Sequence, residues 1–446
     1  MSDVPMLDVY VNSTLVGTLT EEARASVFTY FPDVPAHNLV SLLLPVRAAS
    51  YKWSAGLLPF FQMNLPEGYK KDLVRRLLGA HADVSDMGLL ALTGANSIGR
   101  VRVVPRGASL ESAASNIDMA NLLASVGARN NLLRHLEAGM TEGVSGVMPK
   151  TLAKPDDKAT AWTDEFILKT GPEDLPGLSI NEYLCLEVAR HAGLDVPETQ
   201  LSEDGEVLAI RRFDRLKDGS RVAIEDFCAL KGLDPVNKYK GTVEGLAKLS
   251  ADYISLPFRK ESARRLFTLL LVNYAVRNAD AHLKNFAVMY TSPEDVRLAP
   301  VYDIVTVPAY SQFSTDIPSL PLIGKRVWAS GKLLRQYGGA RLSLSSADMA
   351  ACVAQVTDAV RRVVPMVSEY ANRYPEFRQI AKRMLNVWAQ GLEDIKPDAK
   401  PGKLAPASAP TPLREQAGLS DEAGLAKRIK ANPYVNPDGP FGHKSR

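Results

Sequence analysis

A short polar run between an apolar helix and a predicted hairpin constrains the fold of this chain more than any other segment. The run is residues 277–285 (Arg-Asn-Ala-Asp-Ala-His-Leu-Lys-Asn), and the apolar residues of 260–277 before it recur on one face of a helix. Strands are predicted after it at 286–290 and 296–302, joined by the turn 291–295. A buried helix that leads into a hairpin holds such a loop rigidly, and rigid placement is what catalysis requires.

Three oxygen-bearing side chains are expected to meet at the open end of this hairpin. Pairing the strands about their turn brings Asn285 opposite the region of Asp303, and Asp280 lies five residues before Asn285. Phosphoryl transfer from ATP needs a carboxylate that orients the attacking hydroxyl and oxygen ligands for Mg²⁺, and protein kinases space these groups in the same way. We therefore interpret Asp280 as the base that accepts the proton of the attacking hydroxyl or as the group that orients it, and Asn285 and Asp303 as metal ligands. Lys284 is a candidate for neutralising charge on the transferred phosphoryl group.

The same loop has a structural alternative, because aspartate and asparagine commonly form turns. Its position between a buried helix and a hairpin that ends in another aspartate favours the catalytic interpretation. His282 is expected to fix the loop through a buried hydrogen bond, and it is counted among the candidates for the nucleotide site. The six histidines include no His-x-x-x-His pair, which disfavours a zinc site.

Lys169 is the candidate cation for the ATP phosphates. It stands at the end of a predicted central strand, where the small lobe of a kinase places its nucleotide-binding lysine. Glu182 has two interpretations that stay open at this point. It either pairs with Lys169, as a helix glutamate does in kinases, or completes a capping box with Ser179 at the start of the next helix.

A glycine-bearing loop at 142–151 is a second candidate for the phosphates. It is not a Walker A loop, because Met148 stands where the second glycine should be and Pro149 lacks a backbone donor. A flexible loop without a ligand is the alternative. Four of its residues are candidates for contacting phosphate through backbone N–H groups or positive charge: Ser145, Gly146, Val147 and Lys150.

The segment 211–215 (Arg-Arg-Phe-Asp-Arg) lies where an adenine-binding hinge between two lobes would lie. Arg211 and Phe213 are candidates for the nucleotide site, Phe213 by packing on the base. Asp214 is expected to reach the ribose. The alternative is an ordinary connector held by salt bridges.

Composition bounds the class of protein. With 446 residues, the chain exceeds the usual size of a single core, so two or more domains are expected. Its 46% apolar and 23% charged residues exclude wholesale disorder, and a net charge of +3 disfavours a molecule that binds nucleic acid over its whole surface. The three cysteines lie far apart, as expected in a reducing cytoplasm. No secretory signal or membrane-spanning segment is predicted.

We predict an α+β fold with two lobes, like that of protein kinases. Helices are predicted at 68–78 and 84–92 before a strand at 98–104, and a hairpin is predicted from strands at 196–201 and 207–213. Further helices are predicted at 242–253, 260–277, 346–374 and 376–395. The expected parts are a small α+β domain (1–107), a small lobe (108–215), a helical C-terminal lobe (216–396) and a disordered tail rich in Pro, Ala and Lys (397–446).

Over roughly residues 7–395 the sequence resembles the HipA family of serine/threonine kinases, the toxins of bacterial HipBA-type toxin–antitoxin modules. Several motifs occur in the family's order, which makes coincidence improbable. They are Gly146–Lys150, Asn181-Glu182, Arg212–Arg215, Glu225–Cys228, Asn278–Asn285 and Leu298–Asp303.

The resemblance implies an N-terminal subdomain, a kinase core and an all-α C-terminal part. It implies Lys169 for the ATP phosphates, Asp280 for catalysis, and Asn285 and Asp303 for Mg²⁺, with Phe213 and Asp214 at the nucleotide. Family members phosphorylate aminoacyl-tRNA synthetases, such as glutamyl-tRNA synthetase, and so stall translation. A HipB-like DNA-binding antitoxin neutralises them, and DNA contact is expected only through that complex.

The chain departs from the family in the phosphate loop. The serine that is commonly autophosphorylated is replaced by Gly143, and Ser145 occupies a second position that is phosphorylated in some members. Ser145 is therefore the candidate for autophosphorylation. The sequence leaves two rival functions open: a kinase-fold binding module or corepressor with little activity, and a kinase for a small molecule or lipid.

Overall fold

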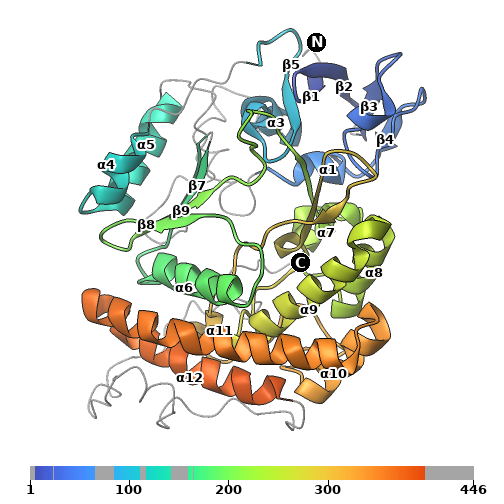
Figure 1. The fold of residues 1–446 in the computed structure, drawn as a ribbon. Helices are drawn as coiled ribbons and strands as arrows, with labels where there is room; N and C mark the ends of the chain where they lie inside the picture. The colour runs from blue at the N-terminus through green and yellow to red at the C-terminus, as the bar shows by residue number, and fades with distance from the viewer. Residues whose placement is uncertain are drawn as a thin grey trace.

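The computed structural model describes residues 6–23, 25–65, 85–110, 117–141, 159–163 and 165–396. The N-terminal part forms an antiparallel five-stranded sheet in the order β4-β3-β2-β1-β5 (Figure 1). Short helices α1 (Pro59–Gln62) and α3 (Asp86–Thr93) belong to the same part, and Phe61 and Leu89 join its apolar core. The strands are β1 (Leu7–Val11), β2 (Thr14–Glu22), β3 (Ala25–Tyr30), β4 (Tyr51–Trp53) and β5 (Val101–Pro105).

Two predicted boundaries in this part shift for local reasons. The helix predicted at 84–92 begins at Asp86, because the Ser85 hydroxyl accepts a hydrogen bond from the Gly88 N–H and caps it. The strand predicted from residue 98 begins at Val101, because Gly99 has a positive φ of 90° that is incompatible with an extended strand. The helix predicted at 68–78 lies outside the described residues.

The small lobe is a four-stranded antiparallel sheet in the order β6-β7-β9-β8. The hairpin predicted at 196–213 is present as β8 and β9. Helices α4 and α5 pack on the sheet through a small core that includes Leu122, Leu132 and Leu168, and α6 joins this lobe to the helices below it (Figure 1). The elements are β6 (Ala159–Trp162), β7 (Phe166–Thr170), β8 (Thr199–Leu201), β9 (Val207–Arg211), α4 (Met119–Ala124), α5 (Ala128–Thr141) and α6 (Leu178–His191).

The C-terminal lobe is mainly helical, and α11 and α12 lie side by side along its lower edge (Figure 1). One apolar core continues from α6 through α9 to these two helices, with Leu184, Phe267, Val360 and Trp388 among its members. The four helices predicted here from apolar spacing are all present. The helices of this lobe are α7 (Phe227–Leu230), α8 (Val243–Tyr253), α9 (Arg259–Ala275), α10 (Gly331–Leu342), α11 (Ser346–Arg373) and α12 (Arg378–Ile395).

This lobe also contains a three-stranded sheet, so it is not all helical. The strands β10 (Ala223–Asp226), β11 (Ala287–Tyr290) and β12 (Arg297–Leu298) pair in the order β10-β11-β12. The strand β10 was not predicted, and β12 is shorter than expected. Pairing stops soon after Leu298 because the Val301 N–H donates to the carbonyl of Asp195, 2.7 Å away, instead of to the sheet.

A buried carboxylate attaches the N-terminal sheet domain to this second sheet. Glu225 on β10 accepts hydrogen bonds from the Ser41 hydroxyl at 2.6 Å, from the Leu42 N–H at 2.8 Å and from the Tyr290 hydroxyl. Burial raises the pKa of Glu225 to about 7, although these hydrogen bonds act in the opposite direction. Within the described residues, no helix is both long enough and apolar enough to cross a membrane.

Candidate active site

The loop that carries Asp280 leaves α9 at a fixed point. Arg277 adopts a positive φ of 58°, and its guanidinium forms a buried ion pair with Asp394 on α12 while lying over the ring of Trp328. Asn278 follows, and its N–H donates to the carbonyl of Asn273 at 2.8 Å, which closes the helix. The helix end and the start of the loop are therefore anchored to two distant elements of the helical lobe.

Asn285 and Asp303 lie within hydrogen-bonding distance, as the hairpin predicts. The Asn285 Nδ2 donates to the Asp303 Oδ2 at 3.0 Å, and its Oδ1 accepts the His282 N–H at 3.1 Å. Asp303 has a φ of 62°, a left-handed conformation that is uncommon outside glycine. Backbone of this kind persists where surrounding contacts hold it and is frequent at functional sites.

One amide links the two aspartates. The Asn278 Oδ1 accepts the N–H of Asp280 at 3.3 Å, and its Nδ2 donates to the carbonyl of Asp303 at 3.4 Å and to the Asn273 Oδ1 at 3.0 Å. Asn278 is itself buried. The positions of Asp280 and Asp303 are thus coupled through a side chain that solvent does not reach.

Lys169 on β7 bridges Glu182 and Asp303. Its Nζ lies 2.5 Å from the Glu182 Oε1 and 2.9 Å from the Asp303 Oδ1. Burial alone would lower the pKa of Lys169, but the two carboxylates outweigh it and raise this pKa above its ordinary value. Lys169 therefore carries its positive charge at neutral pH and is held between the carboxylates of Glu182 and Asp303.

The capping-box interpretation of Glu182 is wrong. Helix α6 begins after Gly177, whose φ is 68°, and no side chain caps it. The Ser179 hydroxyl donates instead to the carbonyl of Glu206 at 2.8 Å. Neighbouring Asn181 bonds both backbone groups of Thr306, which follows the Asp303 turn by three residues.

Asp280 has a partner that sequence reasoning did not find. The Tyr239 hydroxyl donates to the Asp280 Oδ1 at 2.9 Å, and its ring meets the His282 ring edge-on, with centroids 5.2 Å apart. Tyr239 lies 41 residues before Asp280, and no local pattern connects the two. His282 is buried in the loop, as expected, and its N–H donates to the Asp280 carbonyl.

The structure gives Lys284 a different role from the predicted one. Its Nζ donates to the carbonyl of Met63 at 2.8 Å and lies 3.4 Å from the Asp226 Oδ2. Asp226 also caps α7 by accepting the Ala229 N–H at 2.7 Å. Because its ammonium group is tied to the N-terminal domain and to this cap, Lys284 is a connecting residue in this geometry rather than a free phosphate-binding cation.

The segment 211–215 is a salt-bridged connector, which was the alternative interpretation. Asp214 is buried and accepts hydrogen bonds from Arg212, from Arg215 at 2.6 Å and from the Gly99 N–H at 2.8 Å. Burial would raise the pKa of Asp214, but the two arginines hold it below its ordinary value. The expectation that its carboxylate reaches a ribose is therefore wrong for this geometry.

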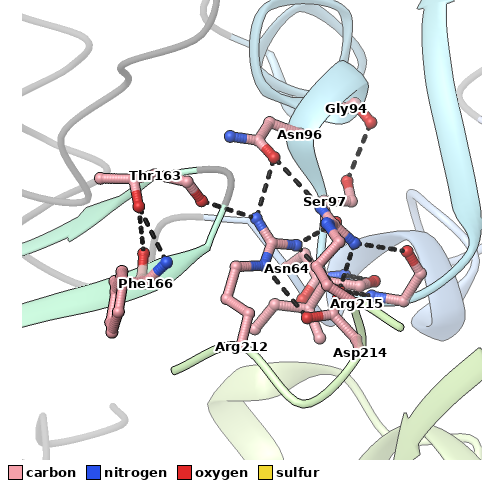
Figure 2. A network of polar contacts seen from close by, with 11 residues as sticks. Asn64, Gly94, Asn96, Ser97, Thr163, Phe166, Arg212, Asp214 and Arg215 are labelled. Atoms are coloured by element: carbon pink, nitrogen blue, oxygen red, sulfur yellow. Dashed lines mark hydrogen bonds and ion pairs between the residues drawn. The ribbon is translucent and has the colours of Figure 1, made fainter. Parts of the chain in front are cut away.

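Figure 2 shows how this connector joins three parts of the chain. Arg212, which is 1% exposed, donates to the side chain of Asn96 at 2.9 Å and to the carbonyls of Ser97 and Thr163. The N-terminal domain, the turn before β7 and the connector thus share one buried guanidinium. Sequence reasoning did not assign Arg212 any role, because its partners lie 49 and 116 residues away.

The other two connector candidates stay accessible. Phe213 is half-buried and stacks on Tyr302, with ring centroids 6.1 Å apart and planes 24° apart. Arg211 is exposed and pairs with Glu165 and Glu198. Tyr302 directly precedes Asp303, so the stacked ring pair is attached to the backbone beside this aspartate.

Comparison with known proteins identifies the family. Residues 7–104 match the model of the HipA N-terminal domain, and residues 143–364 match that of the HipA-like C-terminal domain. "Putative kinase Y4dM" of Sinorhizobium fredii is 30% identical over 345 residues, which is 70% of this chain and 79% of that protein. The chain belongs to the HipA family. "Putative kinase Y4mE" of the same organism is 29% identical over 73% of this chain and 82% of its own length.

The HipA fold is also found in a solved structure, the Shewanella oneidensis MR-1 toxin–antitoxin system HipA, HipB and its operator DNA complex. The match has a TM-score of 0.61 at 19% identity and covers 87% of this chain and 96% of that chain. This likeness shows a shared fold. The α+β kinase-like architecture predicted for the chain is therefore confirmed.

The HipA-family site has donors that suit Mg²⁺ and a nucleotide. Among the described residues, no three His, Cys, Asp or Glu side chains could hold a metal ion together. Mg²⁺ usually takes one or two protein oxygens and completes its shell with water and substrate phosphates, so the Asp303 carboxylate fits this ion. Asn285 presents its Nδ2 to Asp303 and its Oδ1 to the His282 N–H, so its amide would have to turn to place an oxygen on the same ion. The candidates Ser145, Gly146, Val147 and Lys150 lie outside the described residues, as does the predicted tail at 397–446.

Proposed function

We propose that this protein transfers the γ-phosphoryl group of ATP to a serine or threonine hydroxyl of another protein. The observation that carries the proposal is the chain of contacts from Glu182 through Lys169 and Asp303 to Asn285. Kinases of this general class need a lysine–glutamate pair and a metal-binding aspartate in place together. Membership of the HipA family, whose relatives are named as kinases, supports the same reaction.

Each residue has a defined task in this proposal. Asn285 and Asp303 would hold Mg²⁺, and Lys169 would hold the phosphates of ATP. The bound nucleotide and metal would supply the phosphoryl donor and neutralise its charge. Asp280 accepts the proton of the attacking hydroxyl on a carboxylate oxygen, and Tyr239 orients that carboxylate through its hydrogen bond.

The wider biological proposal rests on the family. We infer a growth-inhibiting toxin that phosphorylates an aminoacyl-tRNA synthetase in the cytoplasm, with a HipB-like antitoxin as its partner. The Shewanella complex of HipA, HipB and operator DNA supports this partner. The same proposal includes the division of the chain into parts that end at residues 107, 215 and 396. It also includes the autophosphorylation of Ser145.

Expression of the wild type and of Asp280→Ala in a bacterial host tests this function. Growth is followed, and phosphopeptides of the total protein are measured by mass spectrometry. We expect growth arrest and new phosphoserine or phosphothreonine peptides from the wild type alone. Equal phosphopeptide patterns from the two proteins would contradict a protein kinase and favour the binding-module alternative.

A further inference from the structure

Two partly buried surface segments beside the catalytic loop carry several of the exposed apolar side chains. Nine large hydrophobic residues are exposed in the described part of the chain, and four of them lie in the segments 231–240 and 316–327. Scattered single apolar residues are ordinary on a protein surface, but a group of them around one site indicates an interaction surface. The four are Val236, Ile317, Ile323 and Val327.

Both segments are bonded directly to the loop that holds Asp280. The Leu283 N–H donates to the carbonyl of Lys238 at 3.1 Å. On the other side, the Ser319 hydroxyl and N–H both donate to the carbonyl of Ala279, at 2.6 Å and 3.0 Å. The exposed apolar residues therefore belong to segments whose positions are fixed relative to the proposed catalytic base.

The tip of the 316–327 segment is built in an unusual way. Leu322 and Lys325 pair across a two-residue turn, whose central residues Ile323 and Gly324 have φ values of 50° and 70°. Turns of this type favour Asn-Gly, because a left-handed backbone is costly for a β-branched residue. Ile323 keeps this conformation while 51% exposed, and its N–H is held by the Glu244 carboxylate at 2.8 Å.

The surface around this tip is positively charged. Residues 316–335 contain Lys325, Arg326, Lys332 and Arg335, against the carboxylate of Asp316 and that of Glu244, which accepts the Ile323 N–H. The side chains of Lys325 and Arg326 are exposed, and neither forms a hydrogen bond or ion pair with a described residue. An apolar side chain in a strained, exposed turn, next to two cations that form no ion pair with a described residue, matches the chemistry of an acidic partner with apolar side chains.

We propose that the 316–327 segment, with exposed Val236 on the second segment bonded to the loop, docks the protein substrate through a stretch of that substrate that combines apolar and acidic side chains. The inference rests on the proposed kinase function and names the kind of substrate surface that the site takes. Aliphatic tips favour protein over nucleic acid, since single-stranded nucleic acid is bound on exposed aromatic rings and duplexes on denser positive charge.

Geometry sets the spacing of a test substrate. Ile323 is four residues from Ser319, so its backbone lies within about 14 Å of the point where the segment joins the catalytic loop. At about 3.3 Å per residue, a substrate in extended conformation spans this distance when its anchor lies roughly four residues from its phosphorylated serine. A 20-residue peptide satisfies this spacing if it has a central serine and, on each side of that serine, a Leu-Leu pair flanked by glutamates.

The test compares this glutamate peptide with a counterpart in which lysine replaces each glutamate. Binding to the full chain is measured without ATP by fluorescence anisotropy, and phosphate transfer is measured separately with γ-labelled ATP. The variants are the double reversal Lys325→Glu/Arg326→Glu, and Ile323→Gly, which suits a positive φ and so preserves the turn. Arg361→Glu, at an exposed arginine on α11, is the matched control.

We expect the wild type to bind the glutamate peptide about tenfold more tightly than the lysine peptide, and the double reversal to invert this preference. Ile323→Gly should weaken binding about fivefold without lowering the melting temperature, and Arg361→Glu should change neither. A preference that is absent, or that survives the double reversal, overturns the docking surface. Binding of a 20-base-pair DNA that depends on Lys325 and Arg326 in place of peptide binding also overturns it.

The two proposals fail separately. If wild type and Asp280→Ala transfer phosphate equally while the peptide preference inverts as expected, the kinase function is wrong and the surface is a binding site. If phosphate transfer depends on Asp280 but no variant changes peptide affinity, the kinase stands and the docking surface is wrong.

Discussion

Replacing Lys169 with methionine should destabilise the protein as well as inactivate it. The Glu182 side chain is 3% exposed and has Lys169 as its cationic partner, so the substitution leaves a carboxylate buried beside that of Asp303. Removing one member of a buried ion pair costs about 3–5 kcal/mol. Because Lys169 is 22% exposed and Asp303 is 37% exposed, solvent screens part of this cost, and we expect about 3 kcal/mol.

A second substitution separates this electrostatic cost from other effects. Lys169→Met/Glu182→Met replaces the pair with apolar side chains of similar length, which is often close to neutral, so we expect stability within about 1 kcal/mol of wild type. Urea unfolding followed by circular dichroism measures all three proteins under the same conditions, and both variants should fail to transfer phosphate. A single variant that loses less than about 1 kcal/mol, or a double variant no more stable than the single one, would refute the reasoning.

Three further perturbations follow from the contacts around the site. Tyr239→Phe removes the hydrogen bond to Asp280, so kcat should fall about twofold to tenfold while the KM for ATP stays unchanged. Steady-state kinetics that show no change in kcat would contradict this role of Tyr239. Arg212→Lys should lower the free energy of unfolding, measured in urea, by about 3 kcal/mol, because lysine cannot replace the two guanidinium contacts that hold buried Asp214. A decrease of less than about 0.5 kcal/mol would contradict this role of Arg212. Burial raises the pKa of Glu225 from 4.5 to about 7, so between these pH values the folded chain keeps a proton that the unfolded chain releases. The stability of the wild type relative to Glu225→Gln should therefore fall by roughly 3 kcal/mol as the pH rises from 5 to 8. A difference between these two proteins that does not change with pH would show that the carboxylate is not buried as described.

The parts of the site that lie close together in sequence were predictable. Asn285 and Asp303 are separated by one hairpin, whose strand pattern and turn residues fix which ends meet. The helix α9 was predicted from the spacing of the apolar residues on one of its faces. Local periodicity and turn chemistry were therefore sufficient to bring Asn285 and Asp303 together.

The remaining parts depend on contacts between distant segments. A capping box and an ion pair with Lys169 need the same residue types at Glu182, and only the packing of α6 against β7 decides between them. Lys284 looked available because its partner Met63 lies 221 residues away. For Asp214 the arginines lie within two residues, but the burial that holds them on its carboxylate comes from distant segments such as that of Gly99. The strand β10 was missed because its four residues gain their pairing from β11, 60 residues later in the chain.

The pairing of β10 also explains why the C-terminal lobe was predicted to be helical although it contains a three-stranded sheet. A short strand without alternating polar and apolar residues carries little local signal, and β10 is buried on both faces. The sequence analysis assigned no structural role to its carboxylates, Glu225 and Asp226. In the structure one holds the N-terminal domain and the other caps α7.

The central claim is that Asp280 performs phosphoryl transfer at a site that Lys169, Asn285 and Asp303 assemble. The most direct measurement is the single-turnover transfer of label from γ-labelled ATP to total bacterial protein by the purified chain with Mg²⁺, compared between the wild type and Asp280→Asn. We predict that the variant binds ATP within about threefold of wild type and transfers phosphate at least about 100-fold more slowly, because the proton acceptor is lost while the nucleotide contacts remain. Equal rates from the two proteins would contradict the claim.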